Sequence, residues 1–269
     1  DSEVRAAIAE VRSRGIAVVI VTGRILSELQ QVAGDLHFVD GVVAENGGVL
    51  WFPNGHSRLV ADSSSIRFLQ ELRRRGLDFK AGQCVVELDA LAAPQVLSVI
   101  RDLELPLVLL FNRSRLMVLP QGVSKGNGLR EALATLRLSV HNALAIGDAE
   151  NDHDLLSTCE LGVAVSWGSQ ILQKVADKVL QGDGPTAVAG YIRQAAMNLR
   201  LPPEHIGQHR LLLGIAEDGH ELALAHRRRN MLIAGDPQSG KSWVTGLTCE
   251  QLILQGYSVC VIDPEGDYR

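Results

Sequence analysis

The chain has 269 residues, which is enough for one large domain or two ordinary ones. Its hydrophobic content of 46% and charged content of 21% are ordinary for a globular protein. The formal net charge of −5 argues against broad, non-specific binding of nucleic acid by this segment.

Targeting and redox signals are absent from the sequence. No apolar run approaches the ~18 residues typical of a membrane span, and there is no signal peptide. Cys84, Cys159, Cys249 and Cys260 show no C-x-x-C spacing, so we expect a cytoplasmic protein with free thiols. The chain starts at Asp1 and stops just after Tyr268, within what reads as a domain, so we expect both ends to be cuts.

The first 52 residues alternate between predicted helices and strands. The predicted elements are a helix from Ser2 to about Gly15, a strand over 16–21, a helix over 25–32, and strands over 41–44 and 49–52. The run at 16–21 is apolar and β-branched, as in a strand buried on both faces of a parallel sheet. The turn Glu45-Asn46-Gly47-Gly48 is expected to need positive φ angles.

A compact α/β insertion, the cap, is predicted over residues 53–119. Its elements are helices over 65–75 and 93–103 and extended segments over 84–88, 107–111 and 115–119. Its basic residues are interpreted as solvated faces, with substrate ligands as the alternative: Arg67, Arg73 to Arg75, Lys80, Arg113 and Arg115.

Alternation resumes over residues 120–200. The predicted elements are helices over 125–136, 152–157, 169–175 and 191–199, with strands over 143–146 and 162–165. Together with residues 1–52, this pattern predicts an α/β fold with a doubly wound parallel sheet. Residues 201–209 read as a linker.

A second domain is predicted over residues 210–269. A hairpin is expected around Asp218-Gly219-His220, followed by a strand over 231–234, a helix over 240–254 and a strand over 258–262. The basic run 227–229 is interpreted as a solvated loop.

Three polar clusters fall where predicted strands end or helices begin: Thr22-Gly23-Arg24, Lys125, and the segment 147–152. Ligands of open α/β sheets bind beyond the carboxyl ends of the strands. A hydroxyl with free backbone N–H groups suits a phosphoryl oxygen, a lysine suits the charge of a transferring group, and Asp148 with Asp152 offers hard oxygen ligands for Mg²⁺. Taken singly, the clusters also read as a turn, a surface lysine and a helix cap.

The order of these clusters resembles a known family. VIVTGR (19–24), SKGNGL (124–129) and GDAENDHDLL (147–156) are similar to the second, third and fourth motifs of haloacid dehalogenase (HAD) hydrolases. The ENGG turn resembles the Cof-type branch, whose cap lies between the second and third motifs and which includes sugar and phosphoglycolate phosphatases. The resemblance spans about residues 1–198 and implies a Mg²⁺-dependent phosphatase of a small phosphorylated metabolite.

The resemblance also implies roles for individual residues. Thr22, Lys125, Asp148 and Asp152 become the predicted catalytic residues, with Asp148 and Asp152 as metal ligands. The predicted phosphate-binding residues are those in or beside the motifs: Thr22, Gly23, Arg24, Asn46, Lys125 and Asn151. Glu45 and Asn46 resemble the entry to the cap hinge.

The family's first motif, Asp-x-Asp-Gly at the end of the first strand, is missing from the sequence. No Asp-x-Asp follows a hydrophobic run, and the strand that carries it is expected before Asp1. Covalent phosphoryl transfer needs a positioned nucleophile, so we expect these 269 residues alone to be inactive and the intact protein to be active.

A second phosphate site is predicted in the G-x-x-x-x-G-K-[ST] segment, which lies between a predicted strand and helix as this motif requires. The predicted ATP-binding residues form one continuous loop: Gly235, Asp236, Pro237, Gln238, Ser239, Gly240, Lys241 and Ser242. Backbone N–H groups and Lys241 would hold the phosphates, and Ser242 would ligate Mg²⁺.

Residues 206–269 resemble the HerA/FtsK-type P-loop ATPases, through the lead-in HRRRNMLIAG (226–235) and the segment VCVIDPEGDY (259–268). The resemblance implies ATP and DNA as partners and a hexameric homo-oligomer. Asp263, Glu265 and Asp267 would lie near the phosphates, or form a charged turn. The Walker-B strand is not in the sequence, so hydrolysis of ATP is not expected.

We therefore predict a HAD phosphatase fused to the start of a P-loop NTPase domain. One alternative is a degenerate HAD module that regulates a DNA-translocating ATPase. Another is that the join is an artefact of a gene fragment or fusion.

Overall fold

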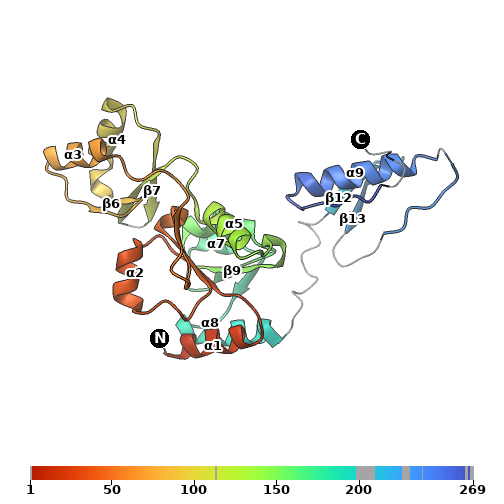
Figure 1. The fold of residues 1–269 in the computed structure, drawn as a ribbon, viewed down its shortest axis with the longest axis horizontal. Helices are drawn as coiled ribbons and strands as arrows, with labels where there is room; N and C mark the ends of the chain where they lie inside the picture. Colours follow the sequence, from red (N-terminus) through yellow and green to blue (C-terminus); the bar gives the residue numbers. More distant parts are fainter. Residues whose placement is uncertain are drawn as a thin grey trace. The chain divides into compact units, whose positions relative to one another are not determined.

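The computed structural model describes residues 2–112, 114–197, 210–225, 231–237, 239–263 and 266. The chain divides into two compact units, Asp1–Leu201 and Pro202–Arg269. In Figure 1 the first unit runs from red to cyan and the second is blue.

The first sheet of unit 1 has the strand order β1 (Val19–Val21), β2 (Gly41–Ala44), β3 (Val49–Trp51) and β4 (Ser57–Leu59). β1 and β2 are parallel, and β3 and β4 continue the sheet as antiparallel strands. Helices α1 (Ser2–Ser13) and α2 (Leu26–Ala33) precede and follow β1. β2 is buried along its whole length, as its run of small and β-branched apolar residues predicts. β4 was not predicted, and it adds part of the expected cap sequence to the core sheet.

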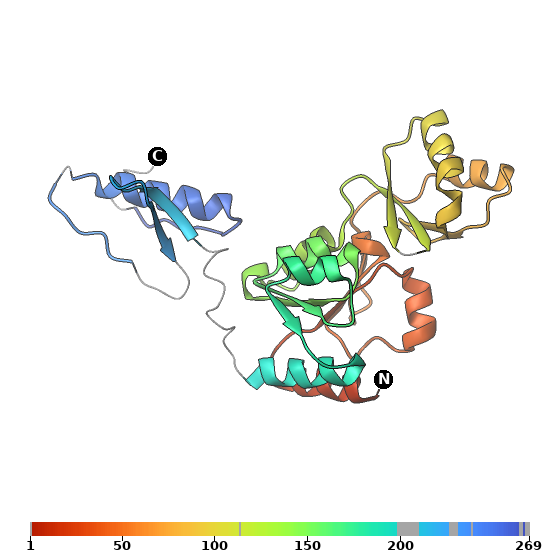
Figure 2. The same cartoon turned by 180° about the vertical axis from the view of Figure 1, so that it is seen from behind.

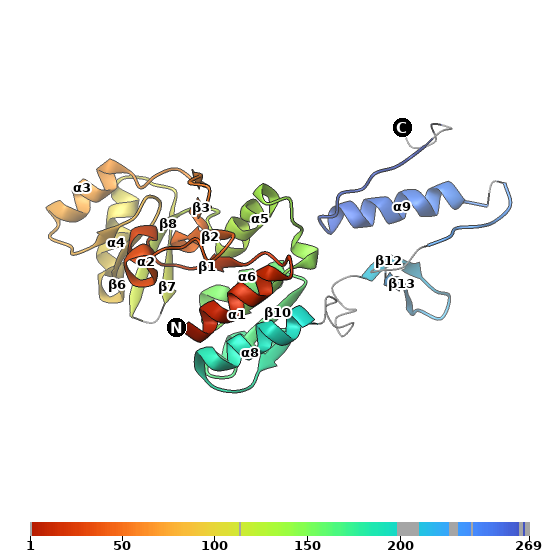
Figure 3. The same ribbon diagram turned by 60° about the horizontal axis from the view of Figure 1, so that its bottom comes forward.

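The second sheet is entirely parallel, with the order β11 (Lys178–Leu180), β10 (Leu161–Val165) and β9 (Leu144–Gly147). The helices of this part are α5 (Lys125–Thr135), α6 (His153–Thr158), α7 (Gln170–Val175) and α8 (Gly184–Met197). Helix α8 lies alongside α1, so the two ends of unit 1 meet (Figure 3). The predicted α/β fold with a parallel sheet is confirmed.

The sheet is, however, divided between β1 and β9. Among the described strands, β1 pairs only with β2, and β9 pairs only with β10. The free edges of β1 and β9 border one slot of about 510 Å³. Its walls are mainly apolar and come from β1, β9, α5 and α8, with Val19, Leu129, Leu133, Leu144, Ile146 and Ile192 among them. Each open strand edge has backbone N–H and C=O groups without a strand partner in the described part of the chain. One further strand in the slot would pair with both edges and cover the apolar walls.

The cap is a four-stranded antiparallel sheet with the order β5 (Lys80–Ala81), β6 (Val86–Asp89), β8 (Arg115–Pro120) and β7 (Leu107–Asn112). Helices α3 (Ile66–Arg74) and α4 (Ala93–Asp102) pack side by side on the sheet, as the reverse view in Figure 2 also shows. Their apolar residues form a separate core with the strands, which includes Phe68, Leu72, Val96, Val99, Leu116 and Val118.

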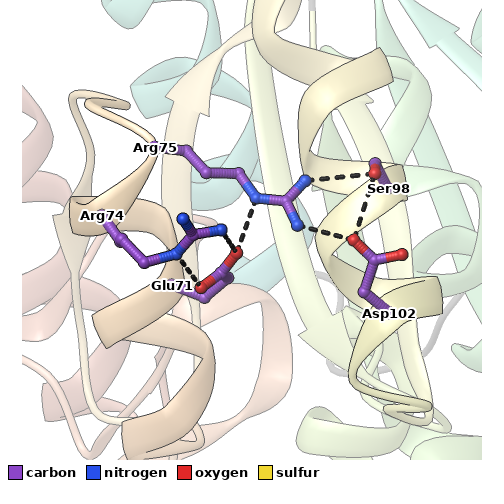
Figure 4. Close-up of polar contacts among 5 residues, drawn as sticks. All are labelled: Glu71, Arg74, Arg75, Ser98 and Asp102. Carbon is purple, nitrogen blue, oxygen red and sulfur yellow. Dashed lines mark hydrogen bonds and ion pairs between the residues drawn. The ribbon is translucent and has the colours of Figure 1, made fainter.

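A network of charged residues joins the two cap helices (Figure 4). Arg75 donates hydrogen bonds to Glu71 at 2.8 Å, to Ser98 at 3.1 Å and to Asp102 at 2.6 Å. Arg74 donates two more to Glu71, and the two arginines lower the pKa of Glu71 to about 2. Arg74 and Arg75 are thus engaged within the cap.

The turn after β2 adopts the backbone predicted for it. Glu45, Asn46 and Gly47 have φ angles of 53°, 56° and 107°. A β-carbon on Gly47 would lie 1.9 Å from the carbonyl oxygen of Ser124, so glycine is required where this turn meets the start of α5.

Unit 2 contains the hairpin β12 (Arg210–Ile215) and β13 (Glu221–Ala225), and the helix α9 (Lys241–Leu254). The hairpin and the helix were predicted. The strands predicted over 231–234 and 258–262 are wrong, because neither segment is in a sheet. A parallel strand needs neighbours, and the only paired strands in the described part of this unit are β12 and β13. Leu232 and Ile262 are accordingly 90% and 88% exposed.

The predicted free cysteines are confirmed. Burial raises the pKa of Cys84 to about 11 and that of Cys159 to about 12, so both remain thiols at neutral pH. None of the helices in the described ranges has the length and apolarity that crossing a membrane requires.

Candidate active site

A cavity of about 440 Å³ lies where β1 and β9 end. Its core-side lining contains every residue predicted for the first site except Asn46: Thr22, Gly23, Arg24, Lys125, Asp148, Asn151 and Asp152. The opposite lining comes from the cap: Glu87, Asn112, Ser114, Arg115 and Met117. The cavity is therefore bounded by both the strand ends of the core and the cap sheet.

The loop after β1 is held by main-chain hydrogen bonds. Thr22 N–H donates to the Val43 carbonyl at 2.8 Å, which extends the parallel ladder by one residue. In return, Asn46 N–H donates to the Thr22 carbonyl at 3.0 Å, and Glu45 N–H donates to that of Arg24 at 3.0 Å. The hinge turn thus fixes the loop that places Thr22 in the cavity lining, where its hydroxyl accepts a hydrogen bond from Arg24 N–H at 3.2 Å.

Lys125 and Asp152 form a buried ion pair. Lys125 Nζ lies 2.5 Å from Asp152 Oδ1, and the two side chains are only 7% and 6% exposed. The other carboxylate oxygen, Oδ2, accepts hydrogen bonds from the N–H groups of Asp148 and Ala149, both at 3.0 Å. Both oxygens of Asp152 are engaged, so this residue orients Lys125 and the backbone after β9.

The start of α5 is packed closely enough to fix Lys125. Ser124 caps the helix by accepting a hydrogen bond from Asn127 N–H, and Asp154 accepts one from Gly126 N–H at 2.8 Å. A β-carbon on Gly128 would lie 2.5 Å from the Gly47 α-carbon. The glycines of this motif therefore let the helix approach the hinge turn, and Asp154 is a supporting residue that sequence reasoning missed.

Asp148 and Asn151 supply the remaining oxygens on the core side. The Asp148 carbonyl accepts a hydrogen bond from Ser169 N–H at 2.8 Å, which fixes the backbone there. The Asn151 amide donates to Asn46 Oδ1 at 3.4 Å, while its own Oδ1 is buried and accepts no hydrogen bond among the described residues. Asn46 lies behind Asn151 and does not line the cavity, contrary to its predicted phosphate-binding position.

This donor set fits Mg²⁺. A carboxylate on Asp148 and an unpartnered amide oxygen on Asn151 are hard ligands at the cavity wall. Among the described residues, no group of three or more His, Cys, Asp or Glu side chains is arranged so that it could hold a metal ion. A sparse set is compatible with Mg²⁺, which retains several waters and binds substrate phosphate through them.

Polar contacts of Glu45 and Glu28 connect the core to the cap. Glu45 is fully buried, and its Oε2 accepts hydrogen bonds from the N–H groups of Cys84 at 2.7 Å and Val85 at 3.2 Å. Lys80 of β5 forms an ion pair with Glu28 of α2. Glu45 therefore attaches the cap to the same turn that holds the Thr22 loop.

The cap wall was not predicted. Arg115, interpreted from the sequence as part of a solvated face, lines the cavity, and so does Glu87. These residues lie on different strands and share no local motif, so only strand pairing in the cap brings them together.

In unit 2, the predicted phosphate loop leads into α9. Gly240 has a φ of 87°, which allows the sharp turn into the helix. Ser239 N–H donates to the Asp236 carbonyl at 3.2 Å, and Lys241 Nζ donates to the same carbonyl at 2.6 Å. Gln238 lies outside the described residues, and the Ser242 side chain is exposed.

A lysine, a hydroxyl and hard oxygens at the ends of parallel strands, beneath an inserted cap, define the site of an α/β phosphohydrolase. The family model of haloacid dehalogenase-like hydrolases matches residues 1–73 and 77–192, and the chain belongs to that family. The predicted HAD resemblance is thereby confirmed for unit 1, and this family match ends at residue 192.

Individual relatives agree with this assignment. The chain is 31% identical over 199 residues to the phosphoglycolate phosphatase of Methanopyrus kandleri, an alignment that covers 69% of this chain and 84% of the relative. Its fold is similar to that of a haloacid dehalogenase-like hydrolase from Bacteroides thetaiotaomicron, with a TM-score of 0.61, 17% identity and coverage of 72% and 92%. A HAD/COF-like hydrolase from Plasmodium vivax gives a TM-score of 0.62 at 18% identity, with coverage of 74% and 89%.

Proposed function

We propose that unit 1 is the Mg²⁺-dependent catalytic part of a phosphatase that hydrolyses small phosphomonoesters to an alcohol and inorganic phosphate. The observation that carries this proposal is the convergence of Thr22, Lys125 and Asp148 on one cavity. The Thr22 hydroxyl and the Gly23 N–H bind phosphoryl oxygens, and Lys125 stabilises the charge that develops on them. Asp152 positions Lys125 through their ion pair.

Asp148 and Asn151 hold the metal in this proposal; Asp152, the second metal ligand expected from the sequence, is replaced by Asn151 because both of its oxygens are already engaged. Mg²⁺, when bound, neutralises charge on the phosphoryl oxygens. Asn46 positions Asn151 through the amide hydrogen bond between them. Binding of Mg²⁺ in this proposal thus depends on oxygens from one short segment after β9 and on the hinge turn that supports it.

The nucleophile comes from a strand that fills the slot between β1 and β9. Both bordering strands are parallel members of their sheets and both end at the cavity. A strand inserted parallel to them would end beside Lys125, where an aspartate could attack phosphorus. Its oxygen forms a bond to phosphorus as the ester bond breaks, and the leaving alcohol oxygen takes a proton from the second aspartate of the Asp-x-Asp motif on the same strand. Water then cleaves the acyl phosphate, which releases inorganic phosphate and restores the carboxylate.

The test uses the full-length protein, including that strand, with a broad panel of phosphomonoesters. The panel includes 2-phosphoglycolate because of the relatives' names. Mg²⁺-dependent release of inorganic phosphate is expected. Asp148→Asn should lower it by at least about 100-fold, since a neutral amide holds Mg²⁺ more weakly than a carboxylate does.

Asp183→Asn, at an exposed position, is the matched control and should leave the rate unchanged. The proposal fails if the full-length protein releases no phosphate from any member of the panel. It also fails in its metal assignment if Asp148→Asn leaves the dependence on Mg²⁺ concentration as it is in the wild type.

The loop 235–242 supports a second function, ATP binding by unit 2. The left-handed Gly240 and the Lys241 side chain folded over the loop are the observations that favour it. Lys241 exchanges the Asp236 carbonyl for the β- and γ-phosphates, and Ser242 ligates the accompanying Mg²⁺. DNA as a partner of this unit follows only from the HerA/FtsK resemblance.

Lys241→Ala should reduce binding of a fluorescent ATP analogue by at least about 10-fold, because the mutant lacks the cation that contacts the phosphates. Phosphatase activity should not change. Lys174→Ala, in the last turn of α7, is the control and should affect neither. Wild-type affinity in Lys241→Ala would remove ATP binding from the proposal, and loss of both activities would mean that the two sites are coupled.

The alternative function remains a degenerate HAD module that regulates a DNA-translocating ATPase. Under this alternative, the strand in the slot between β1 and β9 does not need to carry a nucleophilic aspartate. A full-length sequence in which that strand lacks Asp-x-Asp would favour the alternative over the phosphatase.

A further inference from the structure

The cap wall of the cavity carries a charged pair that the phosphoryl chemistry does not use. Glu87 lies on β6 and Arg115 on the neighbouring strand β8. Arg115 Nη1 is 3.2 Å from Glu87 Oε2, and the two side chains are 47% and 5% exposed. Both residues line the cavity opposite Asp148 and Lys125.

Burying the charged side chain of Glu87 at this position has an unfavourable free energy. A buried carboxylate loses its hydration, and burial raises the pKa of Glu87 while Arg115 acts against that rise. Its Oε2 accepts no hydrogen bond among the described residues, although it lies at ion-pair distance from Arg115. A buried carboxylate of this kind holds the neighbouring guanidinium at the cavity wall.

The guanidinium of Arg115 has N–H donors that are not used by Glu87. A guanidinium carries five N–H donors in a planar fork that matches a carboxylate. Within the described part of the chain, the contact of this guanidinium is the ion pair with Glu87. Arg24 lines the cavity from the core side, and its charge also acts on Glu87. Two guanidinium groups, those of Arg24 and Arg115, line this part of the cavity together with the carboxylate of Glu87, while the charges of Lys80 and Glu28 act on Glu87 from outside this lining.

We propose that Arg115, positioned by Glu87 and assisted by Arg24, binds a carboxylate on the leaving group of the substrate. The inference rests on the proposed phosphatase function and extends it to a substrate class, the phosphomonoesters of small hydroxy acids. Lys125 and Asp148 take the phosphate end, and the cap takes the carboxylate end. A cavity of about 440 Å³ bounded on both sides suits a short leaving group.

A hydroxyl-rich leaving group is the competing ligand for this wall. Such a ligand would donate to the unpartnered oxygen of Glu87 and would not need the charge of Arg115. A carboxylate-bearing substrate therefore depends on Arg115 and a hydroxyl-rich substrate on Glu87, so substitutions of the two residues distinguish the two substrate classes.

The experiment compares two substrates of the full-length protein, 2-phosphoglycolate and 2-hydroxyethyl phosphate, which have the same backbone length and differ at the carboxylate. Arg115→Met should lower kcat/KM for 2-phosphoglycolate by about 10- to 100-fold, as expected for loss of hydrogen bonds to a charged group. For 2-hydroxyethyl phosphate kcat/KM should change by less than about threefold, which also shows that the variant folds.

Two further variants separate binding from positioning. Arg115→Lys keeps the charge without the planar fork and should give an intermediate loss. Glu87→Gln should raise KM for 2-phosphoglycolate while kcat stays near the wild-type value, because it loosens Arg115 without touching the phosphate. Arg101→Met, on the exposed side of α4, is the control and should match the wild type on both substrates.

The outcomes distinguish this inference from the proposed function. If the wild type hydrolyses neither substrate nor any other phosphomonoester, the proposed function fails. If it hydrolyses both and Arg115→Met slows both equally or neither, the carboxylate subsite is wrong and the phosphatase stands. A preference for sugar phosphates that Glu87→Gln removes and Arg115→Met leaves intact would also overturn the inference, in favour of a hydroxyl-binding wall.

Discussion

Lys125→Met should lower kcat of the full-length phosphatase by about 100- to 1000-fold, the usual cost of removing one preorganised group that stabilises transition-state charge. Lys125 is buried at the cavity and held 2.5 Å from Asp152, so bulk water cannot replace its charge efficiently. The measurement is single-turnover and steady-state hydrolysis of the best substrate in the panel.

Asp152→Asn is the companion variant for the role of the ion pair. The asparagine oxygen can still accept hydrogen bonds from the backbone after β9, but its amide cannot attract Lys125. We expect kcat to fall by about 10- to 100-fold, less than in Lys125→Met, because the lysine is present but misplaced. A Lys125→Met protein that folds and retains more than a tenth of wild-type kcat would contradict the assignment.

Gly128→Ala should destabilise unit 1 by about 1–3 kcal/mol, the range typical of overpacking. The added β-carbon would lie 2.5 Å from the Gly47 α-carbon and 2.6 Å from Val43 Cγ1. Because the nearer contact is backbone, α5 or the hinge turn must move, and Lys125 moves with the helix. We therefore expect a lower midpoint of thermal unfolding together with a lower kcat.

Gly190→Ala provides the matched control, since Gly190 also lies within a helix but has nothing within 4 Å of an added β-carbon. There the higher helix propensity of alanine should stabilise the protein by about 0.5–1 kcal/mol, with no change in kcat. Equal effects of the two substitutions on stability would show that helix propensity, and not the contact with Gly47, governs Gly128.

The local elements of unit 1 were largely predictable, because their signals are contained in short segments. β2 was expected at residues 41–44 and lies there, since four small or β-branched apolar residues in a row suit a strand buried on both faces. The hinge turn was expected to need positive φ angles, and Asn46 and Gly47 have them. Such features depend on residues that are adjacent in the chain.

Predictions that depended on strand partners were less successful. The segments 231–234 and 258–262 have the composition of strands, but the described part of unit 2 gives them no ladder to join. In unit 1 one strand of the parallel sheet was expected to be missing, but only the strand pairing shows where the sheet is divided, between β1 and β9. Composition indicates that a segment is able to form a strand, whereas pairing requires a neighbour at the right distance.

By itself, the sequence determined the family and the polar residues that follow each strand, because ligand-binding groups in parallel α/β sheets occur in order at the strand ends. Only the tertiary structure decided which of those residues contact one another. Asp152 meets Lys125, 27 positions away, and Asn151 meets Asn46, 105 positions away. Glu87 and Arg115 line the same cavity because their strands, β6 and β8, are neighbours in the cap sheet. These relations depend on burial and distance in three dimensions, which local sequence patterns do not encode.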